Sequence, residues 1–368
     1  MDAKIEHLSA RTYTIPTDLP EADGTAAWTS TTLVVVQVRA AGKTGLGYSY
    51  THASAAVLIA TTLAQAVLGR DAMDPQAAWS AMQAAVRNLG RDGLAATAIS
   101  AVDTALWDLK AVLVDQPLAT LLGRYREAVP IYGSGGFTSY DDRELARQLA
   151  GWVEREGCHW VKMKIGTHPE QDPARVAAAK SAIGSAGLFV DANGAFGPKQ
   201  AQHFARLFME QDVLWFEEPV SSDDLAGLRL VREHSPAPME IAAGEYGYSP
   251  DYFRRMLEAG AVDVLQADAT RCGGVTGFLQ AATLAAAFHT DLSAHCAPAL
   301  HSHLGCATPR FRHVEWFHDH ARIERMLFDG APLPRDGTIA PDRSRPGLGL
   351  TFKTQDAERF AVASGGRA

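Results

Sequence analysis

The sequence predicts an α/β fold in which a parallel barrel follows a separate N-terminal unit. The chain has 368 residues, which is too many for one ordinary compact core. From residue 129 onward, short apolar segments alternate with helical stretches rich in Ala, Leu and Arg, and the first third of the chain lacks this rhythm. The eight strands expected in the barrel are residues 129–132, 160–165, 188–191, 213–216, 240–243, 262–266, 292–295 and 313–316.

An open, doubly wound sheet is the alternative arrangement for alternating strands and helices. Such a sheet would carry a glycine-rich phosphate turn with the spacing GxGxxG directly after its first strand. The sequence Gly133-Ser134-Gly135-Gly136 stands at this place but lacks the spacing. We therefore favour the barrel.

The N-terminal unit is expected to contain a strand followed by helices. Residues 31–40 are rich in β-branched side chains and predict a strand, with a turn at 41–45. The polar, proline-containing residues 17–30 before this strand are expected to form a loop. Residues 53–122 are rich in alanine, with apolar residues spaced three and four apart, and predict helices that end near Pro117 and Gly123.

Composition and charge exclude several classes of partner. The net charge of −8 gives no electrostatic basis for binding nucleic acid or an anionic membrane. None of the four cysteines forms a CxxC pair, so we expect reduced thiols rather than a disulfide framework. No apolar stretch approaches the length of a membrane span, and the N-terminal residues lack the apolar core of a signal peptide. We therefore predict a cytoplasmic protein.

Acids and bases recur where the expected barrel strands end, which is where barrel enzymes hold their active sites. In strand order they are Lys162 and Lys164, Asp191 and Asn193, Glu217, Glu245, Asp268, His295 and Glu315. Alternate residues of a strand face the same way, so Lys162 and Lys164 share a face, as do Asp191 and Asn193. Charge on a buried parallel strand is costly unless it is paired or hydrogen-bonded.

Three carboxylates on neighbouring strands would also repel one another. A divalent cation among them removes the repulsion, and a set of carboxylates favours the hard ion Mg²⁺. Each residue alone has an ordinary explanation, because a lysine can extend to solvent and an aspartate can cap the next helix. The whole set at one end of a barrel instead indicates an active site.

These motifs, in this order, resemble the enolase superfamily and, more closely, its mandelate-racemase-like branch. They are Lys-x-Lys at 162–164, Asp-x-Asn at 191–193, Glu-Glu-Pro at 217–219, Gly-Glu at 244–245, Asp-x-x-x-x-Gly-Gly at 268–274, His295 and Glu315. Residues 101–109 resemble a helix of that superfamily's cap, and residues 346–349 resemble its C-terminal return.

The resemblance covers nearly the whole chain and implies a modified (β/α)7β TIM-like barrel with an N-terminal α+β capping domain. We expect the cap at residues 1–125, the catalytic barrel at 126–320, and a return segment at 321–368 that packs on the cap. Two cap loops, roughly residues 17–30 and 45–54, should close over the site.

The resemblance also implies a role for each site residue. Mg²⁺ would be bound by Asp191, Glu217 and Glu245. Lys164 and His295 would be the two acid/base groups, with His295 oriented by Asp268. The substrate would be bound by Lys162, Asn193 and Glu315. We expect Lys162 and the cation to lower the pKa of Lys164, so that it can act as a base.

The implied activity is abstraction of the proton next to the carboxylate of a small hydroxy acid, which gives an enediolate. Dehydration of an acid sugar to a 2-keto-3-deoxy acid is the first choice, since Asp18, Glu21 and Asp23 suit a polyol. Racemisation or epimerisation of a 2-hydroxy acid is the alternative. An aromatic or less polar substrate is left open by Tyr13, Trp28, Tyr48 and Tyr50. We also expect a homo-oligomer.

Three rival interpretations are weaker. The muconate-lactonising branch places a lysine at the end of the sixth strand, where this chain has Asp268. A zinc amidohydrolase-type barrel wants His-x-His after the first strand, where Tyr132-Gly133-Ser134 stands. A non-catalytic binding protein would be expected to lack part of the set. The sequence leaves open the roles of His301, His303, His318 and His320.

Overall fold

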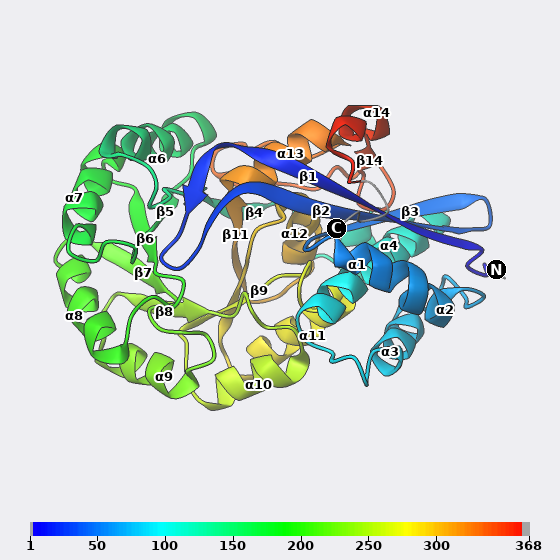
Figure 1. The fold of residues 1–368 in the computed structure, drawn as a ribbon, viewed down its shortest axis with the longest axis horizontal. Coiled ribbons are helices and arrows are strands. Elements are labelled where there is room, and N and C mark those ends of the chain that lie inside the picture. The colour runs from blue at the N-terminus through cyan, green and yellow to red at the C-terminus, as the bar shows by residue number, and fades with distance from the viewer. Residues whose placement is uncertain (1–2, 363–368) are drawn as a thin grey trace, which may run out of the picture.

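The computed structural model describes residues 3–362, and its larger part is a closed barrel of parallel strands (Figure 1). Each strand pairs in parallel with the next, and the ring closes because the last strand pairs with the first. The strands are β4 (Val129–Gly135), β5 (Trp160–Lys164), β6 (Gly187–Asp191), β7 (Val213–Glu217), β8 (Glu240–Ala243), β9 (Val264–Ala267), β10 (Asp291–Ala294) and β11 (Phe311–Phe317). Each range expected to form a barrel strand overlaps one of these strands, so the predicted barrel is confirmed.

Helices join successive strands and cover the outside of the barrel (Figure 1). They are α6 (Asp142–Glu156), α7 (Asp172–Ile183), α8 (Pro198–Met209), α9 (Leu225–His234), α10 (Pro250–Glu258), α11 (Gly274–Ala287) and α12 (Pro298–Cys306). Helix α6 shows how local sequence sets the bounds: Asp141 accepts a hydrogen bond from the Glu144 N–H at its start, and Gly157 ends it with a φ of 70°. Seven strand–helix units followed by an eighth strand, β11, make a (β/α)7β barrel, and α13 (His318–Leu327) comes after that last strand.

The N-terminal unit is a three-stranded antiparallel sheet backed by helices. Its elements are β1 (His7–Ala22), β2 (Ala27–Ala40), β3 (Lys43–Tyr50), α1 (Ser54–Leu58), the π-helical turn Ile59–Leu63, α2 (Ala64–Val67), α3 (Pro75–Ala85), α4 (Leu94–Leu113) and α5 (Leu118–Leu122). The helices expected within residues 53–122 are therefore present. The expected loop at 17–30 is wrong, because most of it forms the far end of a β1–β2 hairpin.

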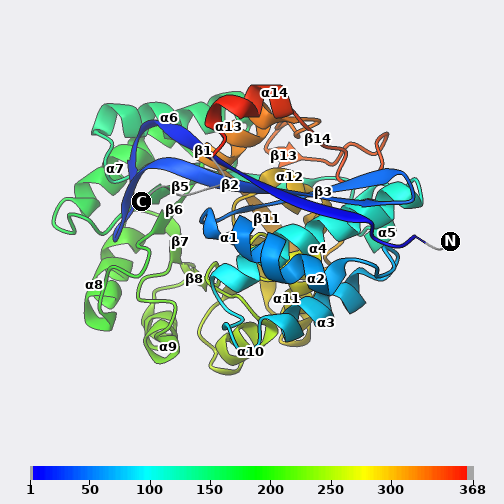
Figure 2. The ribbon, with the colours of Figure 1, turned by 45° about the vertical axis from the view of Figure 1, so that its right-hand side comes forward.

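The hairpin forms despite its polar and proline-rich sequence. Pro16 and Pro20 lie on β1, an edge strand, where a missing N–H is tolerated. Asp23 closes the turn by accepting hydrogen bonds from the Thr25 and Ala26 N–H groups. Beyond the turn, Glu21 lies opposite Trp28 in the ladder. Figures 1 and 2 show this end of the hairpin reaching across the barrel, where the Thr138 N–H donates to Ala22 O at 2.9 Å.

Helix α4 docks the cap on the barrel through buried carboxylates. Asp103 accepts hydrogen bonds from the N–H and hydroxyl of Thr276 on α11, at 2.9 and 2.7 Å. Asp108 accepts from the N–H groups of Leu46 and Leu348, at 2.7 and 2.6 Å. These bonds connect the cap helix to the barrel, to β3 and to the C-terminal segment. Burial raises the pKa of each of these aspartates to about 7.

The C-terminal segment contacts both larger parts of the molecule. It comprises β12 (Phe328–Asp329), β13 (Thr338–Ile339), β14 (Thr351–Phe352), α14 (Thr354–Ala357) and the 3₁₀ turn Glu358–Phe360. Strand β13 pairs antiparallel with barrel strand β4. On the cap side, the Leu118 N–H donates to Gly347 O at 2.7 Å, and the Val362 N–H donates to Thr12 O at 2.9 Å. The boundary expected at residue 320 falls inside α13.

The inside of the barrel is filled below the carboxyl ends of its strands. Tyr132, Phe189 and Trp215 form a buried aromatic layer with Ala242 and Val264. Phe189 stacks on Trp215 with ring centroids 5.0 Å apart. Such a layer closes the barrel beneath the carboxyl ends of the strands, so a ligand can enter only from the cap side. No helix within residues 3–362 combines the length and apolar character needed to cross a bilayer.

Candidate active site

Strand register brings the predicted site residues together at the carboxyl end of the barrel. Lys164 lies beside Asp191, and Asp191 lies beside Glu217, in the ladders of β5, β6 and β7. Contacts described below connect the eight buried residues of the nine in one network. Asn193 is partly exposed, and its N–H donates to Asp191 Oδ1 at 2.9 Å. Charged side chains at this density are stable only because each is paired.

The backbone at the strand ends adopts conformations that are unusual for residues other than glycine. Asn193, Glu218, Cys296 and Ala297 all have positive φ, between 38° and 53°. Gly244 has a φ of 136°, and a Cβ at this position would lie 2.1 Å from Gln266 O. Glycine is therefore required where β8 turns and places Glu245. Backbone strain of this kind gathers at functional sites.

The two lysines are held by different carboxylates. Lys162 Nζ lies 2.5 Å from Glu217 Oε1, 2.8 Å from Glu315 Oε1 and 3.4 Å from Asp191 Oδ2. Lys164 Nζ donates to Asp191 Oδ2 at 2.5 Å. Burial lowers the pKa of Lys164 and so does Lys162, as expected, but Asp191, Glu245 and Glu217 together raise the pKa by more, and the net shift is upward. These side chains alone therefore do not give the expected decrease, to which the cation was also expected to contribute.

Asp191, Glu217 and Glu245 form a cluster of carboxylates that can hold a divalent cation. Each offers an oxygen within 4.8 Å of the others. Burial, and then the charge of Asp191, raise the pKa of Glu217 to about 8. Glu245 Oε2 is buried and has no hydrogen-bond donor among the described residues. Repelling carboxylates and an unsatisfied buried oxygen fit a hard cation with oxygen ligands, as Mg²⁺ requires.

His295 and Asp268 form a dyad. His295 Nδ1 lies 2.8 Å from Asp268 Oδ2, and Asp268 Oδ1 accepts from the N–H and hydroxyl of Thr270 at 2.7 and 2.8 Å. This geometry fixes the imidazole with its proton on Nδ1 and its Nε2 free toward the cavity. Burial lowers the pKa of His295, but Glu245 is among the groups that raise it, and the net shift is upward. His295 Nε2 lies 3.3 Å from Glu245 Oε2.

Glu315 is held between the lysine pair and the dyad. Its Oε1 accepts from Ser134 Oγ at 2.5 Å, and its Oε2 accepts from the Cys296 N–H at 3.1 Å. Burial raises the pKa of Glu315, but Lys162 and then His295 lower it. The net pKa is well below the ordinary value. Glu315 is therefore ionised in this arrangement.

A cavity of about 450 Å³ opens between this network and the cap. Its barrel wall includes Lys164, Asn193, Glu245, His295 and Arg271. On the cap side, both segments expected to cover the site contribute, through Asp23, Trp28 and Ser30 and through Tyr50, Thr51 and His52. Thr31 and Thr32, outside both segments, also line the cavity.

Some of the polar and aromatic cap residues line the cavity, and the others have structural contacts away from it. Of the three acids expected to favour a polyol, only Asp23 lies among the described residues on the cavity wall. Asp18 pairs with His318 at 3.0 Å, and Glu21 accepts from Trp28 Nε1 at 2.8 Å. Trp28 and Tyr50 line the cavity, whereas Tyr13 and Tyr48 are buried in the core.

The other histidines have mainly structural contacts. His301 donates to Cys296 O and accepts from the Ala269 N–H, so it ties two strand-end loops together. His303 connects the Ala119 N–H to Leu348 O. His320 does line the cavity, stacked on Tyr50 with ring centroids 3.4 Å apart, and burial lowers its pKa to about 3.

Sequence reasoning missed Arg271 and Cys296, which also lie on the cavity wall. Arg271 Nη1 donates to Glu245 Oε1 at 3.2 Å, and its Nε lies 3.6 Å from Asp268 Oδ2. The residue thus connects a carboxylate of the metal cluster to the dyad. The signal available was its place three residues after Asp268, because residues three apart in a turn of the chain can lie on the same side.

Comparison with known proteins gives matches along most of the chain. The description "Mandelate racemase / muconate lactonizing enzyme, N-terminal domain" matches residues 10–123, and "Enolase C-terminal domain-like" matches residues 144–357. A 3,6-anhydro-alpha-L-galactonate cycloisomerase of Streptomyces coelicolor is 34% identical over 97% of this chain and 99% of its own.

Solved structures agree with these matches. A mandelate racemase/muconate lactonizing enzyme-like protein from Rubrobacter xylanophilus is 49% identical, with a TM-score of 0.95 over 98% of this chain and 100% of its own. An L-talarate/galactarate dehydratase from Salmonella typhimurium LT2, liganded with Mg and L-lyxarohydroxamate, is 28% identical, with a TM-score of 0.89 over 99% of this chain and 94% of its own.

Proposed function

The chain belongs to the enolase superfamily, in the mandelate racemase/muconate lactonizing enzyme family, and from this premise we propose that it dehydrates an acid sugar to a 2-keto-3-deoxy acid. The observation that carries the proposal is that the two proton-transfer groups, Lys164 and His295, line one cavity together with Glu245 of the carboxylate cluster. Lys164 ends β5 and His295 follows β10, strands that are not neighbours in the barrel. The cofactor is Mg²⁺, and we assign Asp191, Glu217 and Glu245 as its ligands. When bound, the ion supplies positive charge where the substrate carboxylate gains negative charge.

Lysine and histidine divide the proton transfers. Either Lys164 or His295 takes the proton from the α-carbon, depending on the face that the substrate presents. For dehydration, the protonated imidazole of His295 gives its Nε2 proton to the departing β-hydroxyl, which leaves as water. Asp268 is the positioning residue, because it keeps the Nδ1 proton in place and stabilises the imidazolium.

Three residues are proposed to bind the substrate carboxylate and its neighbouring hydroxyl. Lys162 is the buried cation closest to Glu315 and offers positive charge to the developing dianion. A substrate carboxylate beside Glu315 adds negative charge, which raises the pKa of Glu315 and favours the protonated, donating form. Asn193 lines the cavity, and its Oδ1 is buried with no donor among the described residues, so it is available to a hydroxyl.

The cap wall favours a substrate with one carboxylate. Among the described residues that line the cavity from the cap there is neither Lys nor Arg, and Asp23 would repel a second carboxylate. Arg271 on the barrel wall is already paired with Glu245 and Asp268. Hydroxyl and aromatic side chains such as Ser30, Thr51 and Trp28 suit the neutral end of an aldonic or anhydroaldonic acid.

The second candidate is racemisation or epimerisation of a 2-hydroxy acid. It is favoured by the same two groups, since a proton taken by one and returned by the other inverts the α-carbon.

The structural proposals for domains follow the contacts above: a cap at about residues 1–125, a barrel at 126–320 and a return segment at 321–368. A cytoplasmic location agrees with four buried cysteines that form no disulfide. The expected homo-oligomer stays a prediction.

A substrate screen tests the proposal. Aldonic acids, anhydroaldonic acids and the matching aldaric acids should be incubated with the enzyme and Mg²⁺, with 2-keto acid formation as the readout and an EDTA-treated sample as control. We expect 2-keto acid from members of the first two groups. Product from aldaric acids alone would overturn the single-carboxylate proposal, and inversion of a 2-hydroxy acid without 2-keto acid would replace dehydration by racemisation.

A further inference from the structure

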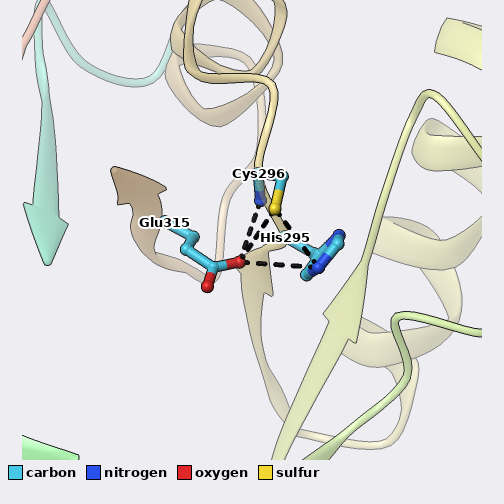
Figure 3. A group of neighbouring side chains, drawn as sticks. All are labelled: His295, Cys296 and Glu315. Atoms are coloured by element: carbon cyan, nitrogen blue, oxygen red, sulfur yellow. Dashed lines mark hydrogen bonds and ion pairs between the residues drawn. The ribbon is translucent and has the colours of Figure 1, made fainter. Parts of the chain in front are cut away.

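Beside the carboxylate cluster, three potential metal ligands of a different chemical kind meet, and two of them line the cavity. They are His295, Cys296 and Glu315, which come from the loop after β10 and from β11 (Figure 3). Cys296 Sγ lies 3.2 Å from His295 Nε2 and 3.4 Å from Glu315 Oε2, and the latter two atoms are 3.7 Å apart. All three residues are buried, and Cys296 has no part in the chemistry proposed above.

These distances match the edges of a tetrahedral zinc site. With bond lengths of about 2.0 to 2.3 Å to nitrogen, oxygen and sulfur, neighbouring ligand atoms in a tetrahedron lie about 3.4 to 3.6 Å apart. The Sγ–Oε2 separation of 3.4 Å lies within this range, and the other two separations lie within a few tenths of an ångström of it. A three-ligand set leaves the fourth position for water or an anion, and the cavity lined by His295 and Cys296 provides it.

Each ligand atom is already oriented by contacts behind it. The Nδ1 of His295 is held by Asp268, which leaves Nε2 free, as in carboxylate–histidine–metal arrangements. The far oxygen of Glu315 is held by Lys162 and Ser134. The backbone of Cys296 is fixed at a φ of 53° by its own N–H on Glu315 and by His301 on its carbonyl. The set is therefore preorganised rather than three mobile side chains.

We propose that His295, Cys296 and Glu315 form a second metal site, which takes a thiophilic divalent ion such as Zn²⁺ and stops the reaction while it is occupied. Sulfur and imidazole select zinc over magnesium, whereas the carboxylate cluster does the reverse. On binding, the Cys296 S–H bond breaks, its proton passes to solvent and a metal–sulfur bond forms. Inhibition rests on the proposed function, because the ion takes Nε2 of His295 and the carboxylate of Glu315 away from the substrate.

Cobalt binding tests the site without any substrate. Co²⁺ is added to Mg²⁺-saturated enzyme, and thiolate-to-cobalt charge-transfer absorption is recorded in the near ultraviolet. We expect one equivalent of this absorption, displaced by Zn²⁺, in wild type and in the control Cys158→Ser, whose cysteine is equally buried but lies before β5. Cys296→Ser, with Cys296→Ala as a second variant, should lose it. Absence of the absorption in wild type, or its persistence in both variants, would overturn the site.

Zinc inhibition tests the consequence. In the turnover assay, Zn²⁺ should compete with the substrate and not with Mg²⁺, and Cys296→Ser should need at least about tenfold more Zn²⁺, since even indirect changes around a metal reduce affinity about 10- to 100-fold. Equal inhibition of wild type and Cys296→Ser would refute the blocking role. If cobalt binds as expected but no acid sugar is turned over, the proposed function fails while the metal site stands.

Discussion

Replacing Asp268 by asparagine should remove the proton-transfer function of His295 while leaving its position intact. The amide can keep both Thr270 hydrogen bonds on one oxygen, but its NH₂ then faces His295 Nδ1, which is 2.8 Å from the carboxylate in the wild type. The imidazole must then accept at Nδ1 and carry its proton on Nε2, the wrong atom for taking a proton. In an aspartate–histidine pair of this kind, the same change lowers turnover about 10⁴-fold. We expect a loss of roughly 10³- to 10⁴-fold here.

The assay is turnover of the substrate found by the screen, together with exchange of its α-proton in deuterated solvent followed by NMR. Asp103→Asn is the matched control, because Asp103 is also buried and also accepts from the N–H and hydroxyl of one threonine, Thr276, but touches no histidine. Asp103→Asn should change the unfolding temperature and leave turnover per folded molecule nearly unchanged. Turnover of Asp268→Asn within about threefold of wild type would refute the assigned dyad.

Three further variants test the metal cluster, a pH effect and the buried lysine. Glu245→Gln should weaken Mg²⁺ binding, measured by calorimetry, by at least about tenfold, and by more than Glu218→Gln at the neighbouring buried acid; equal effects would contradict the ligand assignment. Glu324 has its pKa raised by burial to about 8, so the folded state binds more protons than the unfolded state and stability falls as pH rises from about 4.5 to about 8. Glu324→Gln should reduce that fall by roughly 2 to 4 kcal/mol in urea titrations at about pH 5 and pH 8.5, and an unchanged pH dependence would show that Glu324 is ionised. Lys162→Met should destabilise the fold by roughly 3 kcal/mol, because it leaves buried carboxylates without their cation, and an unchanged unfolding free energy would contradict the pairing.

The barrel and its site were predictable because both follow from local sequence. Short apolar runs ending in a charged residue define the strands, and parallel strands bring their carboxyl ends to one rim. Thus the sequence alone predicts that Lys164, Asp191 and Glu217 meet. Because side chains two residues apart in a strand point to the same face, the sequence also predicted that Lys162 and Lys164 share a face.

Features that depend on distant partners were not predictable. Residues 17–30 form the end of a hairpin because β1 pairs with β2 and because the prolines of β1 lie on an edge strand. Asp18 and Glu21 were expected to suit a polyol substrate, but Asp18 pairs with His318 and Glu21 accepts a hydrogen bond from Trp28. Neither partner could be predicted from sequence spacing. The raised pKa of Lys164 likewise depends on how closely Asp191 approaches it.

The central claim is that Lys164 and His295 carry protons to and from one α-carbon, and solvent deuterium exchange tests it most directly. Wild type, Lys164→Met and His295→Asn should be incubated with Mg²⁺ and the true substrate in deuterated water, and the α-proton and the product followed by NMR. We predict that both variants lose dehydration and that one still exchanges the α-proton, since abstraction needs only one base; a racemase would instead keep exchange of one enantiomer in each variant. Full turnover by both variants would contradict the account.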